Sequence, residues 1–371
     1  MRLPHASRRV VAGVVAGVAL LALAGRVERG ALGPRRQAPG GTSAPAGPAA
    51  SRAGSAPALP ELPLAAAIPL AAEPLAVEAG EGSVWLLEDG GALLRIDPSH
   101  DRITGRLQLG PLAGDAPTEP LAVGAGAVWV GTAGGTVRVD PVTMRPTGRL
   151  GARVEQVADG ALYGRSADLT SLVRTDPRTL RPQPVVVRVR AADGDPGSPI
   201  LQFAVAGGSV WTVGVDGTSL VRSDERGRGA VRVAVPGVPR RLAAAGGALW
   251  VLCVSVQTPT PGGGVTVGPA LLRLDPGRDR PAQVTPLLGL GGNNLVGPVA
   301  GGGWLWLVDR DPIAGSALLR VDPADGRVAG RWQSPRLLGF LLAAGPGGVW
   351  LDHPDAQAGE LLHVDPGRLR P

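Results

Sequence analysis

The stretch LAVGAGAVWVGTAGGTVRVDP, residues 121–141, runs from an apolar segment through a Gly-rich turn to Val-Trp-Val, then through a second turn to a segment ending in Asp-Pro. Residues 75–98 follow the same order, with Trp85 in the place of Trp129. Short apolar segments joined by tight Gly turns are typical of antiparallel β-strands. Each unit is therefore expected to be a group of short antiparallel strands.

The same pattern occurs seven times, at intervals of 34 to 56 residues between its central aromatic side chains. These aromatic residues are Trp85, Trp129, Tyr163, Trp211, Trp250, Trp306 and Trp350. Repeating units of this length with four strands each predict the blades of a β-propeller. We expect the aromatic side chain to pack between neighbouring blades, and the Asp of each Asp-Pro to accept hydrogen bonds from its own turn.

The last unit breaks off soon after Asp365 and Pro366, before a fourth strand. The segment LPLAAAIPLA, residues 62–71, precedes the first unit and has no other place in the pattern. We expect it to complete the seventh blade and close the ring, which removes two unpaired sheet edges. The sequence thus predicts an all-β fold over residues 59–371: a seven-bladed propeller of four-stranded antiparallel blades.

The first 25 residues predict an export signal. Arg8 and Arg9 precede an uncharged run over residues 10–25. This run suits a cleaved signal peptide, read by the general or the twin-arginine route, and equally an uncleaved signal anchor that forms a transmembrane helix. Residues 26–58 are rich in Ala, Pro and Gly and predict a disordered linker. We expect an exported propeller that is anchored to the cell membrane, or secreted after cleavage.

Charge is concentrated at the N-terminal end of the sequence. Residues 1–58 contain eight Arg and one acid, a charge of +7, whereas the whole chain carries +6, so the remainder carries −1. A nearly neutral folded part offers no basic surface for nucleic acid.

The one cysteine, Cys253, lies in an apolar strand-like segment and predicts a buried thiol without a disulfide partner. We expect a monomer.

Loop lengths predict which face of the ring binds other molecules. Length varies in the connections at 110–120, 191–200, 257–268, 289–298, 309–316 and 352–359, which should emerge at one end of the blades. Function often resides on long loops over a rigid scaffold. The ligand-facing residues predicted there are Asp216, Asn293, Asn294, Asp309, Asp311, His353 and Asp355. Their oxygen atoms would suit Ca²⁺ or Mg²⁺, although Asp-Gly pairs are also ordinary turn signals, and no cofactor is predicted outright. We assign no catalytic residue.

The pattern Gly-x-Gly-x-Val-Trp-Val followed by Arg-Val-Asp-Pro, at residues 124–141, resembles the bacterial YVTN/YncE-like and virginiamycin-B-lyase-like propellers. The resemblance extends over residues 62–371 and rests on structural positions. It implies a propeller, and in the lyase branch a histidine and glutamate pair that acts with Mg²⁺. Only His353 is placed to take part in such a pair here. Residues 322–332 also resemble a quinoprotein-type repeat, as a single copy.

The leading hypothesis is an extracytoplasmic interaction module that presents its long-loop face to a protein, glycan or small ligand. The alternative is a metal-assisted lyase or hydrolase in which Asp216, Asp309 and His353 converge at the channel mouth. A third hypothesis is a structural protein of the cell envelope. The residues favour a non-catalytic role and do not identify the ligand.

Overall fold

The computed structural model describes residues 58–370 except 113–118, 167–169, 189–201, 214–216, 261, 276, 288, 291–293, 312–314, 335, 346 and 355–358. The predicted export signal and nearly all of the predicted linker lie outside the described residues. Within the described part of the chain, no helix has the length and apolar character needed to cross a bilayer.

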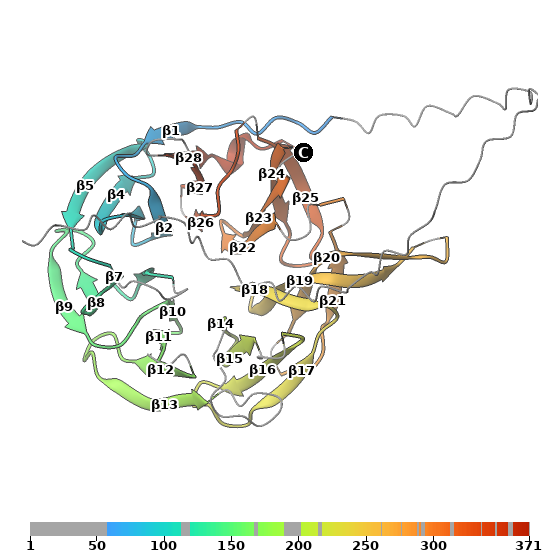
Figure 1. Cartoon of the computed structure of the whole chain (residues 1–371), viewed down its shortest axis with the longest axis horizontal. Helices are drawn as coiled ribbons and strands as arrows, with labels where there is room; N and C mark the ends of the chain where they lie inside the picture. The colour runs from blue at the N-terminus through green and yellow to red at the C-terminus, as the bar shows by residue number, and fades with distance from the viewer. Residues whose placement is uncertain are drawn as a thin grey trace, which may run out of the picture. The chain divides into compact units, whose positions relative to one another are not determined.

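The described strands form seven four-stranded antiparallel sheets, which confirms the predicted seven-bladed propeller (Figure 1). The innermost strands are β2 (Pro74–Gly80), β6 (Leu121–Gly124), β10 (Gln156–Ala158), β14 (Phe203–Ala206), β18 (Val238–Ala245), β22 (Leu295–Gly301) and β26 (Leu342–Gly345). The second strands are β3 (Ser83–Glu88), β7 (Ala127–Thr132), β11 (Ala161–Arg165), β15 (Ser209–Val213), β19 (Ala248–Pro259), β23 (Trp304–Asp311) and β27 (Gly348–His353).

The outer half of each blade completes the sheet. The third strands are β4 (Ala92–Asp97), β8 (Gly135–Val139), β12 (Ser171–Thr175), β16 (Ser219–Asp224), β20 (Val265–Leu274), β24 (Gly315–Val321) and β28 (Glu360–Val364). The outermost strands are β5 (Arg102–Gln108), β9 (Pro146–Leu150), β13 (Pro182–Arg188), β17 (Val231–Ala234), β21 (Gln283–Pro286), β25 (Val328–Gln333) and β1 (Ala66–Pro69). A short 3₁₀ turn, η2 (Pro366–Arg368), follows β28.

Each innermost strand contacts the innermost strand of the next blade, and β26 contacts β2, so the ring is closed. The predicted inter-blade packing of the repeated aromatic residue is confirmed. Trp85 packs against Val128 and Val130 of the second blade, and Trp250 packs against Leu305 of the sixth. All six of these repeated Trp side chains are at most 1% exposed. Burial of these large side chains contributes to the hydrophobic stabilisation of the ring.

A basic residue on the third strand faces each repeated aromatic residue. These residues are Arg95, Arg138, Arg174, Arg222, Arg273, Arg320 and, in the seventh blade, His363. Several reach the following blade. Arg95 donates to the carbonyl oxygen of Val142 over 2.8 Å, and Arg273 donates to that of Ala324 over 2.6 Å. The seams therefore combine apolar packing with charge-assisted hydrogen bonds to the next turn.

The ring closes as predicted, because β1 pairs with β28 and completes the seventh blade. At this seam His363 stacks on Trp350 with ring centroids 4.1 Å apart. Its Nδ1 lies 2.7 Å from Oδ1 of Asp101 in the first blade, and its Nε2 lies 2.8 Å from the carbonyl oxygen of Gly347. One imidazole thus links the last blade to the first.

The expected loop at residues 257–268 is mostly strand. β19 continues to Pro259 and β20 begins at Val265, so only residues 260–264 form the turn of a long hairpin. The reason is the Val and Thr content on both sides of the turn, because β-branched residues favour extended backbone. Ser255 adopts a positive φ of 57° at a register shift, and this bulge bends the hairpin away from the blade. Figure 1 shows it reaching beyond the ring of outer strands.

Candidate interaction surface on the long-loop face

Asp309, a predicted ligand-facing residue, is part of a structural ion pair. It is 1% exposed, and its Oδ2 accepts a hydrogen bond of 2.9 Å from Nη2 of Arg331 on β25. The first blade repeats the arrangement, with Glu88 2.7 Å from Arg106 on β5. Both carboxylates stand three residues after the repeated Trp. A buried carboxylate needs such a partner to offset its desolvation. The ion pair with Arg331 therefore accounts for Asp309 at this position without a bound ligand.

Asp352 fastens the connection between β25 and β26 onto the seventh blade. Its Oδ1 accepts a hydrogen bond of 2.7 Å from the backbone N–H of Leu341. A Cβ atom on Gly339 would overlap the Asp352 carboxylate, which explains why glycine stands there. Burial raises the pKa of Asp352 above its usual value, an effect that the hydrogen bond from Leu341 opposes.

Phe340 and Leu337 of this connection project into solvent. Phe340 is 52% exposed and Leu337 is 45% exposed. The guanidinium of Arg310, at the end of β23, lies 3.6 Å from the Phe340 ring centroid, and its Nε donates to the carbonyl oxygen of Leu338 over 2.6 Å. Nδ1 of His353 lies 2.6 Å from the carbonyl oxygen of Leu337. We call Arg310, Leu337, Phe340 and His353 the blade 6–7 surface.

Of the other predicted ligand-facing residues, only Asn294 and Asp309 have side chains that the structure describes, and neither belongs to this surface. Asn294 is exposed just before β22, and Asp311 ends β23. Asp216, Asn293 and Asp355 lie outside the described residues. Asp309 and His353 stand on neighbouring blades, but each contacts a partner of its own. Among the described residues, no three His, Cys, Asp or Glu side chains are grouped so that they could hold a metal ion.

A group of acids near blades one to three was missed by the sequence analysis. Burial and, less strongly, the charge of Glu119 raise the pKa of Glu78 to about 8. Burial also raises the pKa of Glu155, although Arg165 opposes it through an ion pair of 2.8 Å. The hollow beside Glu119 and Glu155 measures about 20 Å³, enough for one water molecule and too small for a substrate. The available signal was Glu78 itself, which replaces the Gly found at the matching position of residues 121–124.

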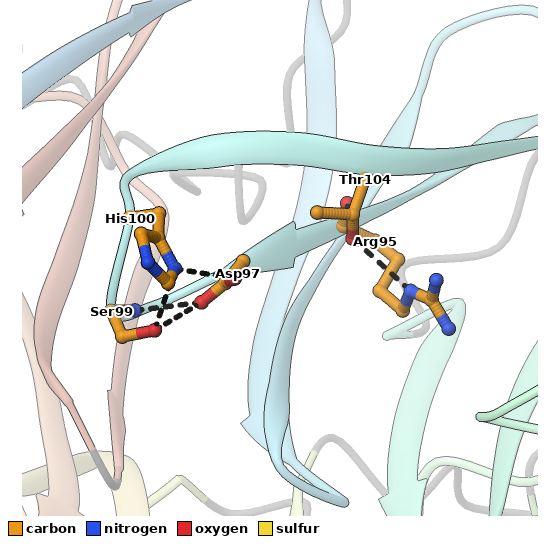
Figure 2. Close-up of polar contacts among 5 residues, drawn as sticks. All are labelled: Arg95, Asp97, Ser99, His100 and Thr104. Atoms are coloured by element: carbon orange, nitrogen blue, oxygen red, sulfur yellow. Dashed lines mark hydrogen bonds and ion pairs between the residues drawn. The ribbon is translucent and has the colours of Figure 1, made fainter.

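Ser99, His100 and Asp97 form a compact cluster on the turn between β4 and β5 (Figure 2). The cluster contains the residue types of a catalytic triad but not its geometry. Nδ1 of His100 lies 2.9 Å from Asp97 and 3.0 Å from Oγ of Ser99, so both partners share one ring nitrogen. In a triad the two partners use opposite nitrogens, which allows proton transfer. Ser99 also donates to Asp97 over 2.6 Å.

These contacts are the turn hydrogen bonds predicted for the Asp of Asp-Pro. The backbone N–H of Ser99 donates to Asp97, and that of Thr143 donates to Asp140 over 2.8 Å. Hydrogen bonds from Ser99 hold the pKa of Asp97 well below its usual value, and the backbone hydrogen bond from Thr143 lowers the pKa of Asp140. The recurring Asp therefore stabilises turns.

Several solved structures share the fold at low sequence identity. The β-propeller domain of Myceliophteria thermophila Cps50 (Swd1) aligns with a TM-score of 0.56 and 12% identity, over 82% of this chain and 100% of that one. U3-55K aligns with a TM-score of 0.53 and 10% identity, over 80% and 100%. Hydrazine synthase of Kuenenia stuttgartiensis aligns with a TM-score of 0.51 and 12% identity, over 84% and 99%.

These similarities support the propeller fold and nothing finer. The chain matches none of the protein families compared with it, and no curated protein. The resemblance to the YVTN and virginiamycin-B-lyase-like families is therefore confirmed at the level of the fold, and membership of those families stays a prediction.

Proposed function

We propose that this chain is a non-catalytic interaction module whose blade 6–7 surface docks a protein partner. The observation that carries the proposal is the exposed Phe340 ring with the guanidinium of Arg310 stacked on it. Aromatic and Arg side chains are the residues that most often dominate the energy of protein interfaces. Such anchors are effective when they are ordered before binding, because less conformational entropy is then lost.

The contacts around the anchor support this role. Arg310 and His353 each engage a backbone carbonyl oxygen of the connection that carries Phe340. Asp352 holds the same connection through Leu341. The two exposed apolar side chains, Leu337 and Phe340, are therefore presented by a segment with several fixed points. We place the module outside the cytoplasm, on the support of Arg8, Arg9 and the uncharged run that follows them.

Site-directed photo-crosslinking tests the proposal. A benzophenone amino acid replaces Phe340 in the full chain in its native cell, and replaces Val142 in a matched control. Val142 is 79% exposed on the turn between β8 and β9, at the other end of the blades. We expect a discrete protein adduct at 340 that is absent at 142 and lost in Leu337→Asp. Equal labelling at both positions, or no adduct at 340, would contradict the proposal.

The affinity of the adduct partner then checks the anchor. Once purified, that partner is expected to bind the Phe340→Ala chain at least tenfold more weakly, since truncation of a central aromatic anchor costs about 2 kcal/mol or more.

The metal-assisted lyase or hydrolase is tested separately by chelation. We expect EDTA, followed by added Ca²⁺ or Mg²⁺, to leave the thermal midpoint of the full chain unchanged, because Arg331 and Leu341 engage the buried Asp309 and Asp352 carboxylates. Ligands that bind only the folded state raise that midpoint by mass action. A reversible shift of several degrees would favour the enzyme hypothesis instead.

A further inference from the structure

The outer edge of β20 lacks a neighbouring strand over part of its length. β20 covers ten residues, whereas β21 pairs with only four of them, Ala270 to Arg273. The last contact of this ladder is a hydrogen bond of 2.9 Å from the N–H of Leu287 to the carbonyl oxygen of Pro269. Toward the hairpin turn, Val265–Gly268 pairs with β19 on one side, and the described residues provide no strand on the other.

The direction of the free backbone groups follows from the ladder. In an antiparallel pair, N–H and C=O groups of alternate residues point to the same side of the strand. The carbonyl group of Pro269 points outward to Leu287, so those of Val267 and Val265 point outward as well. Two residues thus present main-chain donors and acceptors at the spacing that an added strand requires.

No charged side chain on this edge opposes strand addition. Residues 254–270 contain no charged side chain, whereas exposed edge strands are ordinarily guarded by charges or prolines that block pairing. Val265 and Val267 project from one face and are 62% and 61% exposed. Pro259 belongs to the inner strand of the hairpin, and Pro269 marks the end of the free stretch.

A hollow lies on the opposite face of the same hairpin. It measures about 340 Å³ and is lined by Pro236, Val256, Thr258, Val284 and Pro286, among other uncharged residues. Gly268 stands opposite Val256 in the ladder, and a Cβ atom there would meet nothing within 4 Å. A strand added beside β20 would therefore have main-chain partners along one edge and an apolar recess for a side chain.

We propose that this edge binds an extended, uncharged, β-branched segment of a partner protein, which adds antiparallel to Val265–Gly268 and places one apolar side chain in the hollow. The chemistry favours such a segment because residues 254–270 and the side chains that line the hollow are uncharged, so a charged strand would be desolvated without a counter-charge. Residues 26–57 of the chain itself contain only two β-branched residues, Val27 and Thr42, and they contain many prolines. This segment therefore suits the edge poorly. The free stretch is too short to hold a second copy in a stable dimer. This surface is separate from the blade 6–7 surface.

Peptide binding to the full chain tests the assignment. The probe is a fluorescein-labelled peptide with a central Thr-Val-Thr-Val-Thr strand and two Arg placed outside it, after a Gly spacer, for solubility. We expect saturable binding by fluorescence anisotropy, weakened at least tenfold in Val267→Pro, which removes the outward N–H without touching the β19 ladder. Val267→Thr is the matched control and should bind as the parent does. Val265→Lys with Val267→Lys gives an independent loss, at two exposed positions that tolerate charge.

The proposal is overturned by no binding to the parent chain, by equal binding to Val267→Pro, or by equal binding of a probe N-methylated at the residues whose N–H groups would face β20. A doubled mass in light scattering that Val267→Pro abolishes would also overturn it, since the occupant would then be a second copy. The crosslink at residue 340 should persist in Val267→Pro, so failure of the hairpin assignment and failure of the blade 6–7 surface are distinguishable.

Discussion

Glu78 on β2 is a titratable group placed where the neighbouring blade has Gly124. Its pKa is raised to about 8, first by burial and then by the charge of Glu119. Between the ordinary value of 4.5 and about 8, the folded chain retains a proton that the unfolded chain has lost. Stability must therefore fall as the pH rises through this window, and it is unaffected by this group below it.

Glu78→Gln should remove this pH dependence. Because the side chain keeps some contact with solvent, we expect a gain in the free energy of unfolding of about 1–2 kcal/mol at pH 8.5 relative to the parent, with little of that gain remaining near pH 4. Urea titrations at the two pH values measure it. Glu73→Gln, at an exposed position before β2, is the control, and an equal gain in that variant would contradict the assignment to Glu78.

His363 makes three contacts at the closing seam: its ring stacks on Trp350, its Nδ1 lies 2.7 Å from Oδ1 of Asp101, and its Nε2 lies 2.8 Å from the carbonyl oxygen of Gly347. Truncation of the imidazole removes all three contacts at once. We expect His363→Ala to lose about 2–3 kcal/mol in urea unfolding. His100→Ala, at an exposed position on the turn of β4 and β5, should change stability by less than about 0.5 kcal/mol. Equal losses in the two variants would refute the structural role of His363.

Among the elements, the short strand β1 completes the seventh blade and so closes the ring. Ile68 is 5% exposed, pairs with Leu361 of β28, and packs in the cluster around Trp350. Ile68→Ala should destabilise the chain by about 2–4 kcal/mol, because the loss of buried methyl groups leaves a cavity at the seam. Thermal or urea unfolding measures the loss. Val142→Ala, at an exposed turn, is the control, and an Ile68→Ala chain as stable as the parent would show that closure does not depend on this strand.

The repeated elements could be predicted because each blade restates the same local pattern. Trp129 with its Gly turns defines a strand pair, and seven copies leave a propeller as the consistent arrangement. The closing strand could be predicted as well. The seventh unit lacked a fourth strand, and residues 62–71 were the one segment without another place in the pattern. The prediction of a loop at 257–268 was wrong. The Gly and Pro residues at 259–264 indicated a loop, whereas the Val and Thr residues on either side favour strands.

The candidate site was less predictable because it depends on contacts between blades. Asp309 looked like a ligand in a long loop, yet its carboxylate faces Arg331, which the alternation along β25 places across the sheet. Phe340 was overlooked because a single aromatic residue in a loop has no periodic signal. Its significance arises from Arg310, which lies 30 residues earlier, on β23 of the sixth blade.

At the scale of the whole molecule, the reactivity of the Cys253 thiol can be used to measure opening of the ring. It is fully buried in β19, and burial raises the pKa of its thiol to about 12. Thiolate is the reactive form, so the folded chain should be inert to a thiol reagent at pH 8. We expect labelling only as fast as the chain opens, with a rate that increases with urea in parallel with global unfolding. Rapid labelling in the absence of urea would mean that the fifth blade opens locally.

The pairing of β1 with β28 also delays completion of the seventh blade until the end of synthesis. Pro69 is made long before Glu360, its partner in the ladder, and the seventh blade can form only once both are present. At 5–20 residues per second, that interval is roughly 15–60 s. Throughout it the first blade has an uncovered flank, and each later blade has one from its synthesis until the next blade forms, so the nascent chain is open to wrong pairings. The ring therefore stays incomplete for as long as synthesis of the later blades takes, however fast each blade folds.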